Sequence, residues 1–308
     1  MIEITLTPNQ ANRRFDRFLL AYLGRAPQSL VYKLLRKKRI KLNGQRAHGN
    51  EVTAVGDQVI FYLASETLQG LMKEAGPPPR DWGPVDIIYE DEHILLANKS
   101  AGLLTHSDTP GSQDTLVDRL AYYLHEKTDM LPSVCNRLDR NTSGLVACGK
   151  NMAAIQALHA IFASRKVDKT YLAVVCGRLE GRGVLKGYLY KDEKANRSYI
   201  FDQPRENAVK VHTEYECVSV GDGFSVVRIK LHTGKSHQIR AHFAALGHPL
   251  AGDVKYGGRS IGNKRGQLLH CLSLRFLQID SGPLAYLSGQ EWQAAVPTAF
   301  VPYRDKTT

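Results

Sequence analysis

One carboxylate in this chain stands between two arginines in a polar segment flanked by apolar runs. Residues 136–144 read Asn-Arg-Leu-Asp-Arg-Asn-Thr-Ser-Gly, with Asp139 at the centre. Asn, Asp, Thr, Ser and Gly form turns because their side chains bond nearby backbone or tolerate unusual dihedral angles. A carboxylate held among cations stays ionised, the state that a carboxylate nucleophile requires. The segment therefore indicates either a catalytic Asp139 or a structural Asp that caps a turn.

A second polar segment lies further along the chain, where residues 233–242 read Thr-Gly-Lys-Ser-His-Gln-Ile-Arg-Ala-His. Ser236 is a natural N-cap, and the apolar residues that follow recur at helical spacing, so we predict a helix from His237 to Leu246. Two histidines in one helix can indicate a metal site. Because His237 and His242 are five residues apart, they do not stack on one face, and we expect no metal.

Two further segments have to position these groups. Residues 85–99 read as strand, acidic turn and strand, and they end at Lys99, which Ala-Gly-Leu follows after one residue. Residues 169–177, Lys-Thr-Tyr-Leu-Ala-Val-Val-Cys-Gly, read as a buried strand. A Tyr at the edge of a strand is most often part of the core, so residue type alone does not make Tyr171 a site residue.

Taken in their order along the chain, these segments resemble the RluA-type pseudouridine synthases. The signature of that family is His-Arg-Leu-Asp, two variable residues and Thr-Ser-Gly. Asn136 replaces the usual His. The family's Lys-Pro-Ala-Gly-Leu is matched with Ser100 in place of Pro, and its Lys-x-Tyr-x-Ala-x-Val-x-Gly is matched throughout. The third family motif is matched by residues 235–257, with Lys235 where Arg is usual. The matches span about residues 85 to 280.

This resemblance implies an enzyme that converts uridine in RNA to pseudouridine without a cofactor or metal. Asp139 is then the nucleophile or an electrostatic partner of the sugar or base. Arg240 is the cation that pairs with this carboxylate, and Tyr171 lies against the uracil and serves in C5 deprotonation, directly or by placing a base. Arg137 enters the space left by the flipped nucleotide. The remaining substrate contacts that we predict around the motifs are Arg140, Lys99, Thr142, Lys235, His237 and Gln238.

The N-terminal part has its own pattern. Two helices, at residues 13–23 and after an N-cap at Ser29, precede a hairpin at residues 40–46 that turns at Asn-Gly. Together they resemble the alpha-L RNA-binding fold known from a small-subunit ribosomal protein. Between Lys33 and Arg46 there are seven basic residues and no acidic residue; the basic residues are Lys33, Arg36, Lys37, Lys38, Arg39, Lys41 and Arg46. A solvated basic face is the ordinary explanation, but a compact patch suits phosphates.

Composition agrees with an RNA partner. The net charge is +11 and the pI is about 9.4, which favours a polyanionic partner, nucleic acid before membrane. The five cysteines are dispersed without a Cys-x-x-Cys pair, which predicts reduced thiols, a cytoplasmic location and no zinc site. No apolar run approaches the roughly 20 residues of a membrane span, and the start of the chain is no signal peptide. We expect a monomer.

These observations predict an α+β protein with three parts. An alpha-L RNA-binding domain is expected at residues 1–64, a Pro-rich linker at 65–84, and a catalytic domain with a large mixed, mainly antiparallel sheet at 85–308. The resemblance favours large-subunit ribosomal RNA as the substrate, with transfer RNA as the alternative. The competing functions are an inactive RNA-binding ribosome assembly factor and a carboxylate-based glycoside hydrolase, which would need a second catalytic acid.

Overall fold

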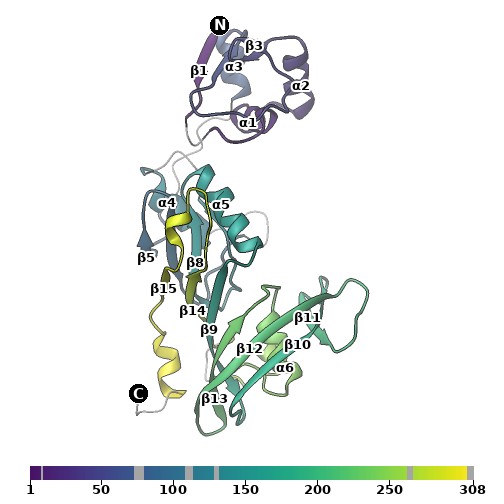
Figure 1. Cartoon of the computed structure of the whole chain (residues 1–308), viewed down its shortest axis with the longest axis vertical. Helices are drawn as coiled ribbons and strands as arrows, with labels where there is room; N and C mark the ends of the chain where they lie inside the picture. The colour runs from purple at the N-terminus through teal and green to yellow at the C-terminus, as the bar shows by residue number, and fades with distance from the viewer. Residues whose placement is uncertain (8–9, 73–79, 108–113, 128–131, 262–265, 304–308) are drawn as a thin grey trace.

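The computed structural model describes residues 1–7, 10–72, 80–107, 114–127, 132–261 and 266–303. It contains two separate sheets, and each sheet has its own buried core (Figure 1). The N-terminal elements are β1 (Ile2–Thr5), α1 (Phe15–Tyr22), α2 (Gln28–Arg36), β2 (Ile40–Leu42), β3 (Gln45–Arg46), β4 (Gln58–Phe61) and α3 (Ser65–Leu71).

The N-terminal sheet has four strands in the order β1-β4-β2-β3. The apolar face predicted for α1 is confirmed, because Phe15, Phe18 and Leu19 are buried against this sheet. The cap predicted at Ser29 is wrong: α2 starts at Gln28, and Pro27 takes the cap position with φ −63°. Proline suits this place because the cap residue has extended backbone, here ψ 150°, which the fixed φ of proline allows.

The N-terminal unit extends further along the chain than residue 64, where we predicted that it ends. Helix α3 falls within residues 65–84, which we expected to be a linker, yet Leu68 is buried in the N-terminal core and Leu71 packs against it. The Pro-rich residues 76–79 lie outside the described residues. The sequence also contains a glycine-rich basic segment at residues 258–266, of which residues 262–265 lie outside the described residues.

The second sheet has eleven strands and forms the body of the molecule. Its strands are β5 (Asp86–Glu90), β6 (Ile94–Lys99), β7 (Ser133–Val134), β8 (Ser143–Gly149), β9 (Val167–Cys176), β10 (Arg182–Asp192), β11 (Arg197–Phe201), β12 (Val209–Val220), β13 (Phe224–Leu231), β14 (Leu269–Phe276) and β15 (Glu291–Gln293). The order is β11-β10-β12-β13-β9-β14-β8-β6-β5, with β15 beside β14 and β7 beside β8. Only the β14–β8 pair is parallel among the described strands, so the predicted large, mainly antiparallel sheet is confirmed.

Three α-helices in the described residues accompany this sheet. They are α4 (Leu116–Leu124), α5 (Met152–Ala163) and α6 (Gln238–Ala245). Helix α4 begins with a capping box from Thr115, and α5 is capped by Asn151 as its sequence predicts. Helix α6 lies beside β11 and β12, whereas α4 and α5 lie on the half of the sheet around β8 (Figure 1).

The start of α6 differs from its sequence pattern. The predicted Ser236 cap is wrong, because His237 occupies the cap position in the left-handed region at φ 56° and no side chain caps the helix. A non-glycine residue in this region costs free energy that the surroundings must offset, and such residues cluster at functional sites. His237 is in fact held by tertiary contacts at the candidate site.

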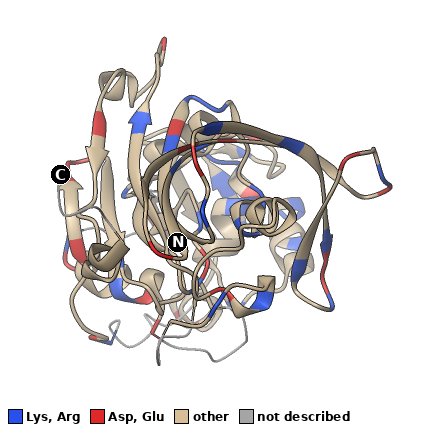
Figure 2. Cartoon of the chain, turned by 90° about the horizontal axis from the view of Figure 1, so that it is seen from below, with Lys and Arg blue, Asp and Glu red and all other residues tan. Residues whose placement is uncertain are grey.

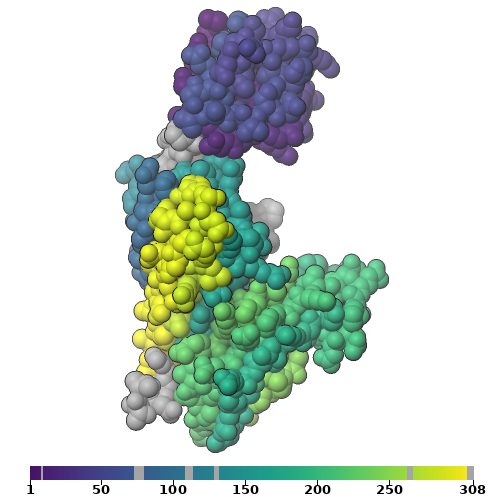
Figure 3. All heavy atoms as spheres, in the orientation of Figure 1, coloured from purple at the N-terminus to yellow at the C-terminus, as the bar shows by residue number. Residues whose placement is uncertain are grey.

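The surface follows this division into parts. The N-terminal unit forms a separate lobe, and the body is hollowed between α5 and the projecting β10–β11 arm (Figure 3). Within the described residues, no helix combines the length and the apolar character that crossing a bilayer requires.

Candidate active site

Asp139 stands in a tight turn at the entrance to β8. The backbone N–H of Thr142 donates to the carbonyl of Asp139 at 3.0 Å, which closes the turn. The Thr142 hydroxyl is buried and accepts a hydrogen bond from Gln267 Nε2 at 3.0 Å. Thr142 borders the cleft, and these two hydrogen bonds fix the turn from inside.

The glycine that ends the motif is required by close packing of two strands. Gly144 has φ 111°, and a Cβ at this position would lie 2.2 Å from the carbonyl oxygen of Cys271 on β14. A side chain would thus push apart the parallel β8–β14 pair. The neighbouring Ser143 hydroxyl is 2.9 Å from His270 Nδ1 on the same strand, so the turn is tied to the centre of the sheet.

Asn136 has a structural task that explains why it can replace a histidine. Its Nδ2 donates to the carbonyl of Leu145 at 3.0 Å, and its Oδ1 accepts from the N–H of Ala147 at 2.8 Å. One donor and one acceptor on the same side chain thereby join the strand that enters the turn to the strand that leaves it. Neutral histidine also carries one donor and one acceptor.

Lys99 also braces the turn, contrary to the prediction that it contacts the substrate. It is fully buried, and its ammonium group donates to the carbonyls of Ser100, Leu103 and Arg140 at 2.9, 2.7 and 3.0 Å. Burial lowers the pKa of Lys99 to about 7, although the charge of Asp139 acts to raise it. Lys99 therefore holds the Asp139 loop together beneath the cleft.

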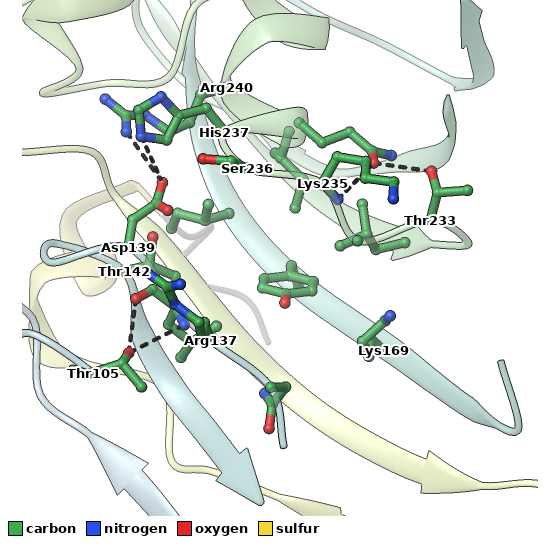
Figure 4. Close-up of a pocket in the computed structure, with 18 of the residues that line it drawn as sticks. Thr105, Arg137, Asp139, Thr142, Lys169, Thr233, Lys235, Ser236, His237 and Arg240 are labelled. Atoms are coloured by element: carbon green, nitrogen blue, oxygen red, sulfur yellow. Dashed lines mark hydrogen bonds and ion pairs between the residues drawn. The ribbon is translucent and has the colours of Figure 1, made fainter. Parts of the chain in front are cut away.

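The carboxylate of Asp139 faces a cation that is itself held in place (Figure 4). Arg240 donates from Nη1 to Asp139 Oδ2 at 3.1 Å, and from Nε and Nη2 to the two oxygens of Asp253 at 2.6 and 2.8 Å. Burial acts to lower the pKa of Arg240, but the bonds to Asp253 and then Asp139 outweigh it and the pKa is raised. Arg240 is thus a permanently charged, fixed donor next to Asp139.

His237 approaches the same carboxylate from the other side. Its Nε2 lies 3.8 Å from Asp139 Oδ2, and its Nδ1 lies 3.0 Å from the hydroxyl of Tyr256. That hydroxyl also accepts the backbone N–H of Ser198 at 2.7 Å. Burial lowers the pKa of His237. The imidazole therefore lies between Tyr256 and Asp139, with Nε2 on the side of the carboxylate.

Tyr171 lies in the floor of the cleft. It is buried on β9 yet borders the cavity beside Asp139. Burial raises the pKa of Tyr171 well above its ordinary value, and the Cys271 thiol and the charge of Asp139 act in the same direction. At neutral pH the phenol is therefore protonated and offers a donor and an aromatic face.

The cleft that contains these groups has a volume of about 1050 Å³, which exceeds the ~300–1,000 Å³ of typical small-molecule pockets. It runs from α5 to the β10–β11 turn. Among the described lining residues Asp139 is the only acid, whereas eight are basic: Arg137, Arg140, Arg165, Lys169, Lys191, Lys235, Arg240 and Lys255. Figure 2 shows Lys and Arg at several places along the long curved strands of the body, with Asp and Glu between them. The cleft thus suits a polyanion.

The other predicted contacts fall into two groups. Arg137, Arg140 and Lys235 are exposed and border the cleft, as a substrate contact must. Gln238 also borders the cleft but is buried; its Oε1 accepts from the Thr233 hydroxyl at 2.9 Å, and its Nε2 donates to the Thr213 hydroxyl at 2.9 Å. Gln238 therefore anchors the start of α6 to β12.

In the N-terminal lobe, the predicted basic patch lies on α2 and the hairpin that follows it. Lys41 is partly exposed, and the other members are exposed: Lys33, Arg36, Lys37, Lys38, Arg39 and Arg46. The Lys41 ammonium group lies 5.1 Å from the centre of the Tyr62 ring. The patch is thus available to a partner, although exposure alone does not identify one.

One group of described residues has potential metal ligands close together. Ligand atoms of His212, Glu214 and His232 lie within 4.8 Å of one another. The two imidazole rings are stacked, however, with centres 4.1 Å apart and planes inclined by 12°. A metal ion must lie in the plane of each ring that binds it, so this stacked pair would have to rotate before both rings could bind one ion. His237 and His242 contact different partners, Tyr256 and Thr213.

Sequence reasoning missed two residues that organise this site, Asp253 and Tyr256. Both occur in the segment Gly-Asp-Val-Lys-Tyr-Gly at 252–257, which follows α6. The match to the third family motif includes this segment, but the match alone gave Asp253 no role. Its relation to Arg240 depends on the chain folding back after α6, which no local pattern reveals.

Comparison with known proteins places the chain among RNA-modifying enzymes. The family model described as RNA pseudouridylate synthase matches residues 93–245. The Bacillus subtilis protein called uncharacterized RNA pseudouridine synthase YlyB is 30% identical over 280 residues, 89% of each chain. The ribosomal large subunit pseudouridine synthase C of Escherichia coli is 29% identical over 296 residues, 91% of this chain and 89% of its own. The solved structure of human RNA pseudouridylate synthase domain containing 1 is 27% identical with a TM-score of 0.56, and it covers 76% of this chain and 89% of its own.

Proposed function

The chain belongs to the RNA pseudouridine synthase family, and we propose that it isomerises specific uridines in large-subunit ribosomal RNA with Asp139 as the catalytic nucleophile. The observation that carries this proposal is the geometry at Asp139. Its carboxylate is partly exposed to the cleft, and Arg240 is aligned on it by a second, buried carboxylate. A nucleophile needs this combination of access and fixed orientation.

The reaction cuts the bond from uracil N1 to the ribose, turns the base and joins C5 to the same sugar carbon. Asp139 is placed to act at the sugar or base, while Arg240 keeps its carboxylate oriented. Tyr171 contributes as a neutral phenol, because its raised pKa disfavours a phenolate base. Of the two C5 roles that the resemblance allows, we therefore favour the placement of a base.

Arg137 and the size of the cleft bear on access to the base. The reacting atoms of a uridine within a helix cannot reach Asp139 unless the nucleotide is turned out, which costs a few kcal/mol and less in a loop. Arg137 is exposed at the edge of the cleft and has the length to fill the space that the base leaves. Unpaired or loop uridines are therefore the proposed targets.

Among the alternatives, a glycoside hydrolase would require two carboxylates that flank the bond to be cut. Asp139 is the only acid among the described residues that line the cleft. The nearby Asp253 is almost fully buried and has both oxygens bound by Arg240. An inactive assembly factor would not need the Asp139–Arg240 pair or Tyr171 beside the cleft. The site therefore favours isomerisation.

The choice of ribosomal RNA rests on the Escherichia coli relative, whose name states that it acts on the large ribosomal subunit. The basic patch on α2 and the hairpin would add phosphate contacts outside the catalytic cleft. The experiment that tests the substrate maps pseudouridines in total RNA from cells with and without this gene. Loss of sites in large-subunit ribosomal RNA alone is the expected result. Loss of pseudouridines in transfer RNA alone would contradict the proposed substrate but would still agree with the proposed reaction.

A further inference from the structure

The cleft is also lined by residues that the catalytic groups do not use, and we call this part of it the second arm. This arm is lined by the end of α5, the start of β9 and the loop after β13, which contribute Phe162, Arg165, Lys169 and Lys235. No acidic residue is among the described residues that line it. Figure 4 shows Lys169 extending from β9 toward the loop that carries Lys235.

Lys169 is an unusual lysine in this setting. It is partly buried, yet no hydrogen bond or ion pair joins its ammonium group to any other described residue. The adjacent Asp168 does not neutralise it, because that carboxylate is paired with Lys230 at 2.9 Å. Burial lowers the pKa of Lys169. The ammonium group thus carries a desolvation cost that a bound anion would offset.

The local backbone leaves room for this ammonium group. A Cβ built on Gly234 would lie 3.4 Å from Lys169 Nζ, so the side chain rests against the bare backbone of the loop. Lys235 follows immediately and is exposed. The loop therefore brings a second cation to the same arm without closing the space between them.

Lys169 also stands in a fixed relation to the reacting base. It precedes Tyr171 by two residues on β9, so both side chains point to the same face of the sheet, about 7 Å apart along the strand. If the uracil lies against Tyr171, the arm receives the part of the RNA chain that adjoins the target nucleotide. The charged group of that part is its phosphodiester.

We propose that Lys169, with Lys235, binds the phosphodiester that adjoins the target uridine, and so positions the nucleotide over Asp139. This inference rests on the proposed function. It makes Lys169 a positioning residue, and it predicts that the enzyme requires a charged linkage next to the target rather than a nucleoside alone. The two lysines would hold the chain as point charges, without reading its sequence.

The test uses the full-length protein and a short RNA that contains a uridine shown to be modified by the wild-type enzyme. Each linkage beside the target is replaced in turn by an uncharged methylphosphonate. The nucleotide before the linkage carries a 2′-O-methyl group in both the charged and the uncharged RNA, so that the chain is stable. Dissociation constants are measured by fluorescence anisotropy for the wild type and Lys169→Met, which keeps length and removes charge.

In the wild type, one of the two substitutions should weaken binding about tenfold, which corresponds to about 1.4 kcal/mol. In Lys169→Met, the charged and uncharged RNA should bind alike, both near the weakened wild-type value. Lys166→Met is the matched control. It removes the same charge just before β9 begins, from a lysine outside the cleft whose ammonium group is paired with Asp280 at 2.7 Å. It should respond to the methylphosphonate as the wild type does.

The inference is overturned if Lys169→Met still shows tenfold weaker binding to the uncharged RNA, or if neither substitution affects the wild type. The second outcome needs no variant, so it decides even if Lys169→Met fails to fold. Failure of the proposed function is a different result: the wild type would form no pseudouridine in any RNA, and no target would be found to test. Product formation without coupling between Lys169 and the linkage refutes only the inference.

Discussion

Arg240 and Asp253 form a two-bond ion pair inside the protein, with donor–acceptor distances of 2.6 and 2.8 Å. Both side chains are nearly inaccessible, since 9% and 2% of their surfaces are exposed. The pair leaves one guanidinium nitrogen, Nη1, to face Asp139 at 3.1 Å. Asp253 thus sets the direction from which Arg240 meets the carboxylate of Asp139.

Asp253→Asn should therefore reduce turnover, although residue 253 bonds to Arg240 and does not contact the substrate. The amide cannot accept from both guanidinium nitrogens, so Arg240 loses its alignment, and a displacement of about 1 Å near the reacting groups can cost about 10²-fold in rate. Single-turnover kinetics of pseudouridine formation measures this loss. Asp222→Asn, at an exposed turn, is the control and should leave the rate unchanged. A rate equal to the wild type in Asp253→Asn would show that Arg240 needs no such support.

Asn136 provides a test of how the catalytic turn is braced. Asn136→His should keep most of the stability and activity, because imidazole can also donate to Leu145 and accept from Ala147. Asn136→Leu keeps similar bulk but leaves both backbone groups without a partner, at about 1–3 kcal/mol per buried group. Urea unfolding of the three proteins measures the difference. Equal stability of the Leu and His variants would contradict the bracing role.

Acid should destabilise the protein through buried histidines. Burial lowers the pKa of His242 to about 4, whereas an unfolded histidine has a pKa of about 6.5. Between these values the unfolded chain binds a proton that the folded chain does not, so the free energy of unfolding falls as the pH falls from about 6.5 to about 4. The limiting slope is about 1.4 kcal/mol per pH unit for this group.

The matched variant is His242→Gln, whose amide can still bond to Thr213 but does not titrate in this range. Urea unfolding at several pH values should show the wild type losing stability relative to this variant as the medium becomes more acidic. A difference that stays constant from about pH 6.5 to about pH 4 would mean that His242 titrates alike in both states.

The basic patch of the N-terminal lobe should contribute to affinity through phosphates. Lys37→Gln combined with Lys38→Gln should lower the slope of log affinity against log salt by roughly 0.7–0.9 for each phosphate that the protein no longer binds. Titration of structured RNA across a salt series measures the slope. The control combines Lys127→Gln and Arg178→Gln, whose charges are paired with Glu90 and Glu180. If both double variants retain the wild-type slope, the patch is a solvated surface, and the RNA-binding role proposed for this lobe is wrong.

Local patterns predicted most of the elements around the site. The alternation and turn residues of the β5–β6 and β2–β3 hairpins, and the Asn151 cap, act between neighbours in the chain, so they can be read from sequence. The motif at Asp139 also lies in the cleft, where Arg137, Asp139 and Thr142 are among the lining residues. The polar residues next to each motif were harder to assign. Lys99 and Gln238 resemble RNA contacts in sequence, yet both are buried supports.

The remaining errors come from contacts between distant segments. The His237 cap takes a left-handed conformation because Tyr256 holds its ring, nineteen residues further on. Asp253 is recognised only once the chain has folded back after α6 onto Arg240. Helix α3 looked like part of a linker because a short helix with few apolar residues gives a weak pattern, although Leu68 completes the N-terminal core.

The most direct test of the central claim is pseudouridine formation by Asp139→Asn. The amide has the shape of the carboxylate but neither its charge nor its nucleophilicity, and the residue is partly exposed, so the fold should persist. Release of tritium from RNA labelled at uridine C5 measures product, and anisotropy confirms that RNA still binds. We predict no turnover above background with RNA affinity within about threefold of the wild type, a difference below about 0.7 kcal/mol. Turnover near the wild-type rate in folded Asp139→Asn protein would contradict the assignment of Asp139 as the catalytic group.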